Sequence, residues 1–146
     1  MVTLLLYSER TRANVPPPPT VMHKLLYVDD EEMIGRVVAR YFSRRGDQVF
    51  IAHSIAEATR ILEVEDPSAV LIDVWLGDES GFELLDWIED RKPHLARNVT
   101  FVTGEYVDED APPRVWRTLG RPVIQKPFEL ASLARTLDDA GSRAGT

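Results

Sequence analysis

The sequence predicts an α/β fold: a doubly wound parallel sheet of five strands, with helices packed on both of its faces. Short apolar runs alternate along the chain with segments in which apolar residues recur every three or four positions. Strands that alternate with helices are typical of parallel sheets built from right-handed crossovers. The run at residues 69–72 (AVLI) is unbroken and leads into Asp73, as expected for a strand that is buried on both faces.

The predicted strands and helices have ordinary boundaries. Strands are expected at residues 25–28, 48–52, 69–73, 99–103 and 123–126. The helices between them are expected from residue 34 to Gly46, from Ser54 as N-cap to residues 66–67 (DP), from Gly81 to just before Pro93, and after Pro127. Between residues 105 and 120, Pro112 and Pro113 exclude a helix interior, so the sequence supports at most a short helix at residues 114–119.

The domain is expected to occupy residues 24–140. Residues 1–23 predict a flexible, proline-containing N-terminal extension, because a polar stretch without periodicity is followed by four consecutive prolines at residues 16–19. Residues 141–146 predict a disordered tail. No further domain follows residue 140 in this sequence, so any output is expected to depend on binding to a partner protein.

Composition excludes several classes of function. The 146 residues include no cysteine, which rules out disulfides, thiolate metal sites and cysteine nucleophiles. The formal net charge of −7 argues against nucleic-acid binding or adhesion to an anionic membrane as the main activity. The N-terminal apolar run at residues 2–7 is far shorter than the ~20 residues of a membrane-spanning helix. A cytoplasmic protein is therefore expected.

Polar side chains stand where the predicted strands end. Asp29 and Asp30 follow the first strand, Asp73 ends the third, and Thr103 and Lys126 end the fourth and fifth. In a parallel sheet these ends meet at one edge, where such folds bind ligands. Three neighbouring carboxylates repel one another and suit Mg²⁺, while a hydroxyl and a lysine suit the oxygens of a transferring phosphoryl group. The alternative is that Asp29 and Asp30 only cap the first helix, Asp73 only binds turn amides, and Lys126 is a surface charge.

Four segments resemble the signature segments of the response-regulator receiver domain of two-component phosphorelays. They are residues 28–31 (VDDE), 71–73 (LID), 102–104 (VTG) and 126–128 (KPF), in the order of that family. The resemblance covers about residues 24–140. It implies a flavodoxin-like (βα)5 fold with strand order 2-1-3-4-5, and a cis peptide bond between Lys126 and Pro127.

The resemblance also implies the roles of the site residues. Asp73 is expected to accept the phosphoryl group, with Thr103 hydrogen-bonded to it and Lys126 paired with it. The Mg²⁺ ligands are expected to be Asp29 (largely through water), Asp30, Asp73 and the main-chain carbonyl of Trp75.

Three departures from the family pattern concern the output surface. Gly77 stands where receivers commonly have proline, which predicts a looser segment after Asp73. Val123 stands where an aromatic side chain usually switches position, and Pro112-Pro113 disrupts the fourth helix. Residues 120–123 (GRPV) are similar to those of receivers associated with hybrid histidine kinases.

The function expected from the resemblance is that of a single-domain response regulator. It would take a phosphoryl group from a histidine kinase or a histidine phosphotransfer protein and signal through changed binding to a downstream protein. It would catalyse only its own phosphorylation and dephosphorylation. One alternative is a receiver-like interaction module that is never phosphorylated. Another is an aspartyl phosphatase, which usually needs a second aspartate two residues after the nucleophile, where this chain has Trp75.

Overall fold

The computed structural model describes residues 22–104, 121 and 123–144 of the chain. The extension at residues 1–21 and the short helix predicted at residues 114–119 lie outside these residues, as do Pro112 and Pro113. None of the described helices is both long enough and apolar enough to cross a membrane.

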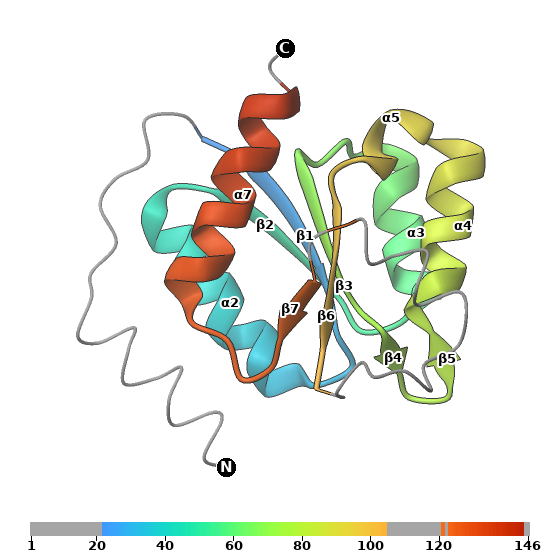
Figure 1. Cartoon of the computed structure of the whole chain (residues 1–146), viewed down its shortest axis with the longest axis horizontal. Helices are drawn as coiled ribbons and strands as arrows, with labels where there is room; N and C mark the ends of the chain where they lie inside the picture. The colour runs from blue at the N-terminus through green and yellow to red at the C-terminus, as the bar shows by residue number, and fades with distance from the viewer. Residues whose placement is uncertain (1–21, 105–120, 122, 145–146) are drawn as a thin grey trace.

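A parallel sheet of five strands forms the centre of the molecule (Figure 1). Its strands are β1 (Lys24–Val28), β2 (Gln48–Ala52), β3 (Ala69–Asp73), β6 (Val99–Thr103) and β7 (Val123–Gln125). They are arranged in the order β2-β1-β3-β6-β7, and each neighbouring pair is parallel. Counting only these strands, the order is 2-1-3-4-5, so the predicted fold class and topology are confirmed.

Helices cover both faces of the sheet (Figure 1). Helices α2 (Glu32–Arg45) and α7 (Leu130–Ala144) lie on one face, whereas α3 (Ile55–Val64), α4 (Gly81–Arg91) and α5 (Pro93–Ala96) lie on the other. Alternate strand residues fill two separate cores. In β1, Leu25 and Tyr27 pack with α2 and α7, while Leu26 and Val28 pack with α3 and α4. This alternation fixes the face on which each strand-end residue lies.

The segment after Asp73 is more regular than the sequence indicates. Instead of the looser segment predicted there, β4 (Trp75–Leu76) and β5 (Glu79–Ser80) form a small antiparallel hairpin. Gly77 has a φ of 66° in its turn. Proline has a fixed negative φ and could not adopt this conformation, so glycine suits the turn.

Besides shifts of one or two residues at the ends of elements, the structure adds three features that the sequence did not predict. Helix α4 ends at Arg91, but a short helix that the sequence analysis missed, α5, begins directly at Pro93, because proline is well tolerated in a first helical turn. The backbone of α7 remains helical to Ala144, past the domain end predicted at residue 140. His23, assigned to the extension, is tied to the domain, because its N–H donates to Asp47 and its carbonyl accepts from Gln48.

Candidate functional site

The predicted site residues lie at the carboxyl edge of the sheet. Asp29 directly follows β1, Asp73 ends β3, and Lys126 directly follows β7. Because side chains alternate along a strand, Asp29 shares a face with Tyr27, and Lys126 shares a face with Ile124. Both Tyr27 and Ile124 belong to or pack against the core beneath α2 and α7. Asp29, Asp73 and Lys126 therefore lie close together at the carboxyl end of the sheet, on the face that α2 and α7 cover.

Lys126 is the cation at the centre of this group of acids. Its Nζ lies 2.7 Å from Oδ2 of Asp73, 2.9 Å from Oδ2 of Asp29 and 3.2 Å from Oε1 of Glu31. The Asp29 side chain is fully buried, and those of Lys126 and Asp73 are only 9% and 10% exposed. The Coulomb attraction between charges shielded from water in this way exceeds that of a surface pair.

Backbone and phenol donors hold the two buried carboxylates in fixed orientations. The N–H of Trp75 donates to Oδ1 of Asp73 at 3.1 Å. The N–H of Glu31 donates to Oδ1 of Asp29 at 3.0 Å, and the hydroxyl of Tyr27 donates to Oδ2 of Asp29 at 2.8 Å. The site is thus preorganised by its own strand ends and the loops that follow them.

The site carries more negative charge than Lys126 neutralises. Burial raises the pKa of Asp73 from 3.8 to about 6, and the charge of Asp29 adds to this, although the hydrogen bond from Lys126 opposes it. Burial lowers the pKa of Lys126, but its hydrogen bond to Asp73 and the charge of Asp29 outweigh burial and raise that pKa overall. Because both pKa values are raised, the site holds its protons tightly, and it favours added positive charge for the same reason.

The donor set fits a hard divalent cation. Asp29, Asp30 and Asp73 each present a carboxylate oxygen, and these oxygens lie within 4.8 Å of one another. Asp29 and Asp73 are buried while Asp30 is exposed, so the group faces solvent on one side. Carboxylate oxygens with room for water are the ligands that Mg²⁺ prefers. The residues present therefore suit Mg²⁺ on their chemistry and their excess charge.

Thr103 lies at the same edge, on the strand beside Asp73. Thr103 is buried, with 2% of its surface exposed. The residue before it, Val102, pairs with Asp73 in the sheet. The carbonyl of Thr103 accepts the backbone N–H of Lys126 at 2.8 Å, which ties the lysine segment to β6. The Lys126–Pro127 bond is cis, as the resemblance implied.

Gly81 lies directly against the main chain of Asp73. A Cβ atom at position 81 would lie 2.2 Å from the carbonyl oxygen of Asp73, well inside any allowed contact. The N–H of Gly81 donates to the carbonyl of Val74 at 2.7 Å. The start of α4 therefore packs directly on the end of β3, which only glycine at position 81 permits.

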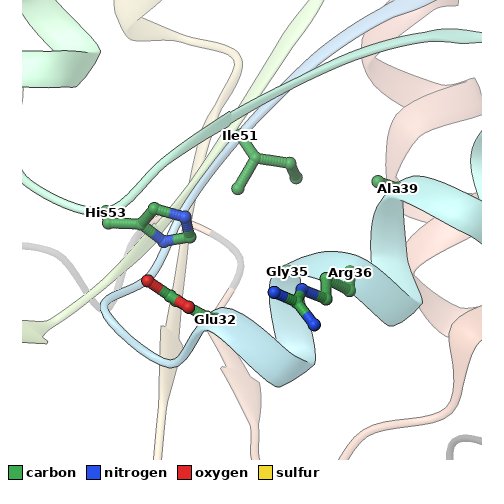
Figure 2. Close-up of a pocket in the computed structure, with 6 residues that line it drawn as sticks. All are labelled: Glu32, Gly35, Arg36, Ala39, Ile51 and His53. Atoms are coloured by element: carbon green, nitrogen blue, oxygen red, sulfur yellow. The ribbon is translucent and has the colours of Figure 1, made fainter.

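A hollow of about 340 Å³ lies beside the site, between α2 and β2 (Figure 2). It is lined by Glu32, Gly35, Arg36, Ala39, Ile51 and His53. The ring Nδ1 of His53 lies 3.1 Å from the carbonyl oxygen of Asp29, and the N–H of His53 donates to Glu57 at 2.8 Å. His53 therefore links this hollow to the loop that carries the acids.

Three residues that contact the site were not predicted from the sequence: Tyr27, Glu31 and His53. Tyr27 stands two positions before Asp29 in a strand, so the alternation of side chains was a signal that could have found it. Glu31 is part of the acidic run after β1, but nothing local relates it to Lys126, from which it is 95 residues away. His53 directly follows a different strand, β2, and no local pattern connects it to Asp29.

Comparisons with known proteins agree with this arrangement. The family model of the response regulator receiver domain matches residues 25–138. The transcriptional regulatory protein GltR of Pseudomonas aeruginosa is 31% identical over 86 residues, which cover 59% of this chain and 36% of GltR. The sensory transduction protein LytT of Enterococcus faecalis is 27% identical over 126 residues, which cover 85% of this chain and 50% of LytT. The chain thus spans about a third to a half of the length of these relatives.

A solved structure has the same architecture. The crystal structure of a CheY-like response regulator receiver domain protein from Methanospirillum hungatei JF-1 matches with a TM-score of 0.70 and 25% identity, covering 84% of this chain and 99% of that one. Phosphorylation and Mg²⁺ binding are general properties of receiver domains, which interact with histidine kinases and downstream effectors. The chain belongs to the response regulator receiver domain family of two-component signalling.

Proposed function

We propose that this chain is a response regulator that accepts a phosphoryl group on Asp73 from the phosphohistidine of a histidine kinase or a histidine phosphotransfer protein. One observation carries the proposal most directly. The Asp73 carboxylate is buried beside two further aspartates, and its Oδ2 lies 2.7 Å from the Nζ of Lys126. A nucleophile, excess negative charge and a cation thus lie within a few ångströms of one another.

In the proposed transfer, a carboxylate oxygen of Asp73 attacks the phosphorus of the donor. A P–O bond forms, the P–N bond to the donor imidazole breaks, and its electron pair stays on the imidazole nitrogen. The ammonium of Lys126 pairs with a phosphoryl oxygen, and the hydroxyl of Thr103 hydrogen-bonds to another. Asp29, Asp30, Asp73 and the carbonyl of Trp75 would hold Mg²⁺, which would neutralise phosphoryl charge when bound.

The output is proposed to be a change in binding to a downstream protein, in the cytoplasm. Val123 is 37% exposed beside the lysine segment, so this surface offers an aliphatic contact in place of an aromatic one. GltR is named as a transcriptional regulatory protein, but the matched part is 36% of its length. With a net charge of −7, this chain is not proposed to bind nucleic acid itself. The only reactions proposed for it are its own phosphorylation and dephosphorylation.

The test is incubation with acetyl phosphate and Mg²⁺, followed by intact mass measurement. Wild type should gain one phosphoryl group that is stable in acid, labile in base and absent when Mg²⁺ is omitted. Asp73→Asn should gain none. Asp78→Asn is the matched control, since Asp78 is an exposed acid in the turn of the neighbouring hairpin and should be labelled like wild type.

Two results would contradict the proposal. Equal labelling of Asp73→Asn and wild type would mean that another group is the nucleophile. No labelling of wild type by acetyl phosphate or by phosphohistidine donors would favour the alternative of an interaction module that is never phosphorylated.

Lys126→Ala should still bind Mg²⁺ but lose much of the transfer rate, because the carboxylates remain while the cation for the phosphoryl oxygens is lost.

A further inference from the structure

We propose that the hydroxyl of Tyr27 is a positioning group for Asp29, and that it sets the affinity of the site for Mg²⁺. The inference rests on the proposed function, since it concerns the same metal site. Tyr27 would not touch the ion or the phosphoryl group. It would act through Asp29, by holding one carboxylate oxygen in place.

The geometry of the pair is well defined. The hydroxyl of Tyr27 donates to Oδ2 of Asp29 at 2.8 Å, and both residues are fully buried. Tyr27 belongs to β1, which is flanked on both sides: Tyr27 pairs with Ile51 of β2 and with Leu71 of β3. A donor held on a central strand has little freedom to move away from its acceptor.

The contacts to the Asp29 carboxylate are not all kept when a phosphoryl group arrives. Oδ1 accepts the N–H of Glu31, while Oδ2 is shared between Tyr27 and the ammonium of Lys126 at 2.9 Å. In the proposed transfer, Lys126 pairs with the phosphoryl group. Tyr27 is then the side-chain donor that stays on Oδ2 and keeps the buried carboxylate oriented. A neutral hydroxyl adds no positive charge beside the ion, so it does not repel the ion.

Tyr27 also contacts the segment that carries the lysine. Its ring meets the ring of Phe128 edge to face, with centroids 6.5 Å apart and planes at 72°. Phe128 is 6% exposed and stands two residues after Lys126. One side chain thus touches the acid through its hydroxyl and the lysine segment through its ring. Removing a side chain that hydrogen-bonds to a metal ligand commonly weakens metal affinity by about 10- to 100-fold.

Tyr27→Phe tests the proposal, because it removes the hydroxyl and keeps the ring against Phe128. Tyr41→Phe is the matched control: Tyr41 is a buried tyrosine of the same core, at the far end of α2 from the acids. Mg²⁺ binding is measured by titration calorimetry on the full chain. We expect the dissociation constant of Tyr27→Phe to rise about tenfold and that of Tyr41→Phe to stay within twofold.

A spectroscopic measurement separates positioning from a general loss of stability. With ¹³C-labelled aspartate and no metal present, the carboxyl resonance of Asp29 should move in Tyr27→Phe and stay in place in Tyr41→Phe. At saturating Mg²⁺, the rate of labelling of Tyr27→Phe by acetyl phosphate should recover to near that of wild type. A merely structural role for the hydroxyl would move neither the resonance nor the Mg²⁺ requirement selectively.

The proposal does not depend on Tyr27→Phe folding. In wild type carrying fluorotyrosine, Mg²⁺ should shift the ¹⁹F resonance of Tyr27 and leave that of Tyr41 unchanged. An unmoved Tyr27 resonance, or equal Mg²⁺ affinity in wild type and Tyr27→Phe, overturns the inference while leaving the proposed function intact. A wild type that binds no Mg²⁺ overturns both.

Discussion

Two buried clusters of charged side chains lie at opposite ends of the sheet. At the carboxyl end, Lys126 lies among Asp29, Glu31 and Asp73. At the amino end, Arg45 contacts Asp47 at 3.1 Å and Asp138 at 2.6 Å. Arg45 is the last residue of α2, and Asp47 directly precedes β2. Because α2 begins beside Asp29 and runs the length of the sheet, it connects the two clusters.

The clusters differ in the balance of their buried charges and in access to solvent; at the amino end one buried arginine, Arg45, faces one buried acid, Asp47, so this cluster is balanced. The side chains of Arg45 and Asp47 are 6% and 0% exposed, and Asp47 also accepts the N–H of His23 at 3.1 Å. The ring of His23 lies 3.4 Å from Asp138. The residues of this cluster therefore come from α2, from α7 and from the segments directly before β1 and β2. At the carboxyl end two buried acids, Asp29 and Asp73, share one lysine and Asp30 is open to solvent, so this cluster is unbalanced. A buried ion pair alone therefore does not mark a site; an excess of buried acids beside an exposed one does.

The largest expected effect comes from breaking the balanced cluster. Arg45→Met should lower the free energy of unfolding by about 3–5 kcal/mol, because it leaves the buried Asp47 without its cation. The measurement is urea denaturation followed by circular dichroism. Arg44→Met, an exposed neighbour in the same turn, should change the free energy of unfolding by less than about 0.5 kcal/mol. If both variants lose the same stability, the two arginines are equivalent and the comparison fails.

Mg²⁺ should stabilise the protein only through the unbalanced cluster. A ligand at ten times its dissociation constant that binds the folded state alone adds about 1.4 kcal/mol. We expect this gain for wild type in a thermal melt with MgCl₂, against NaCl of equal ionic strength. Asp30→Asn should lose most of the gain, because it removes the solvent-facing carboxylate. An undiminished gain in Asp30→Asn would place the ion elsewhere.

Removing an acid from the unbalanced cluster should not weaken the fold. Without Mg²⁺, Asp73→Asn should unfold with a free energy equal to that of wild type or about 1 kcal/mol higher, because it relieves repulsion with Asp29 while Lys126 keeps that partner. Urea denaturation in EDTA measures this. A loss of more than about 1 kcal/mol would mean that Asp73 is a structural ion-pair partner, as Asp47 is at the other end.

The smallest expected effect concerns the lifetime of the phosphorylated protein. Trp75 is 46% exposed in the hairpin after Asp73, and its indole is expected to obstruct the water that attacks in line behind the phosphorus. Trp75→Asn should shorten the lifetime about threefold, which corresponds to about 0.7 kcal/mol in the barrier. The decay is followed after removal of the donor, with Asp78→Asn as control. An equal or longer lifetime in Trp75→Asn would show that the indole only packs on the loop or contacts a partner.

The sequence predicted the sheet and the edge at which the acids meet, because strands buried on both faces leave strong apolar runs. The runs end at Asp29, Asp73 and Lys126, so their convergence followed from parallel topology. The roles of these residues came from the resemblance and remain proposals. The hairpin after Asp73 was missed because two-residue strands carry no periodicity. The contact between Arg45 and Asp138 joins residues 93 positions apart, and no local pattern encodes such a pair.

The strands that carry the site differ in how well their amides are shielded from solvent and from hydrogen exchange. Strands β1 and β3 are flanked on both sides, and every residue of β3 is buried. Strand β7 is three residues long, stands at an edge of the five-stranded sheet, and has exposed residues at both of its ends. Native-state hydrogen exchange reports the opening of such units one by one. The amides of β7 should exchange well before those of β3.

This order of opening has a consequence for the site. The acids follow or end strands that are flanked on both sides, whereas the lysine follows a short edge strand that is expected to open earlier. A local opening of β7 would withdraw Lys126 and leave Asp29 and Asp73 where they are. The ammonium is therefore the movable member of the group, and the carboxylates are its fixed frame.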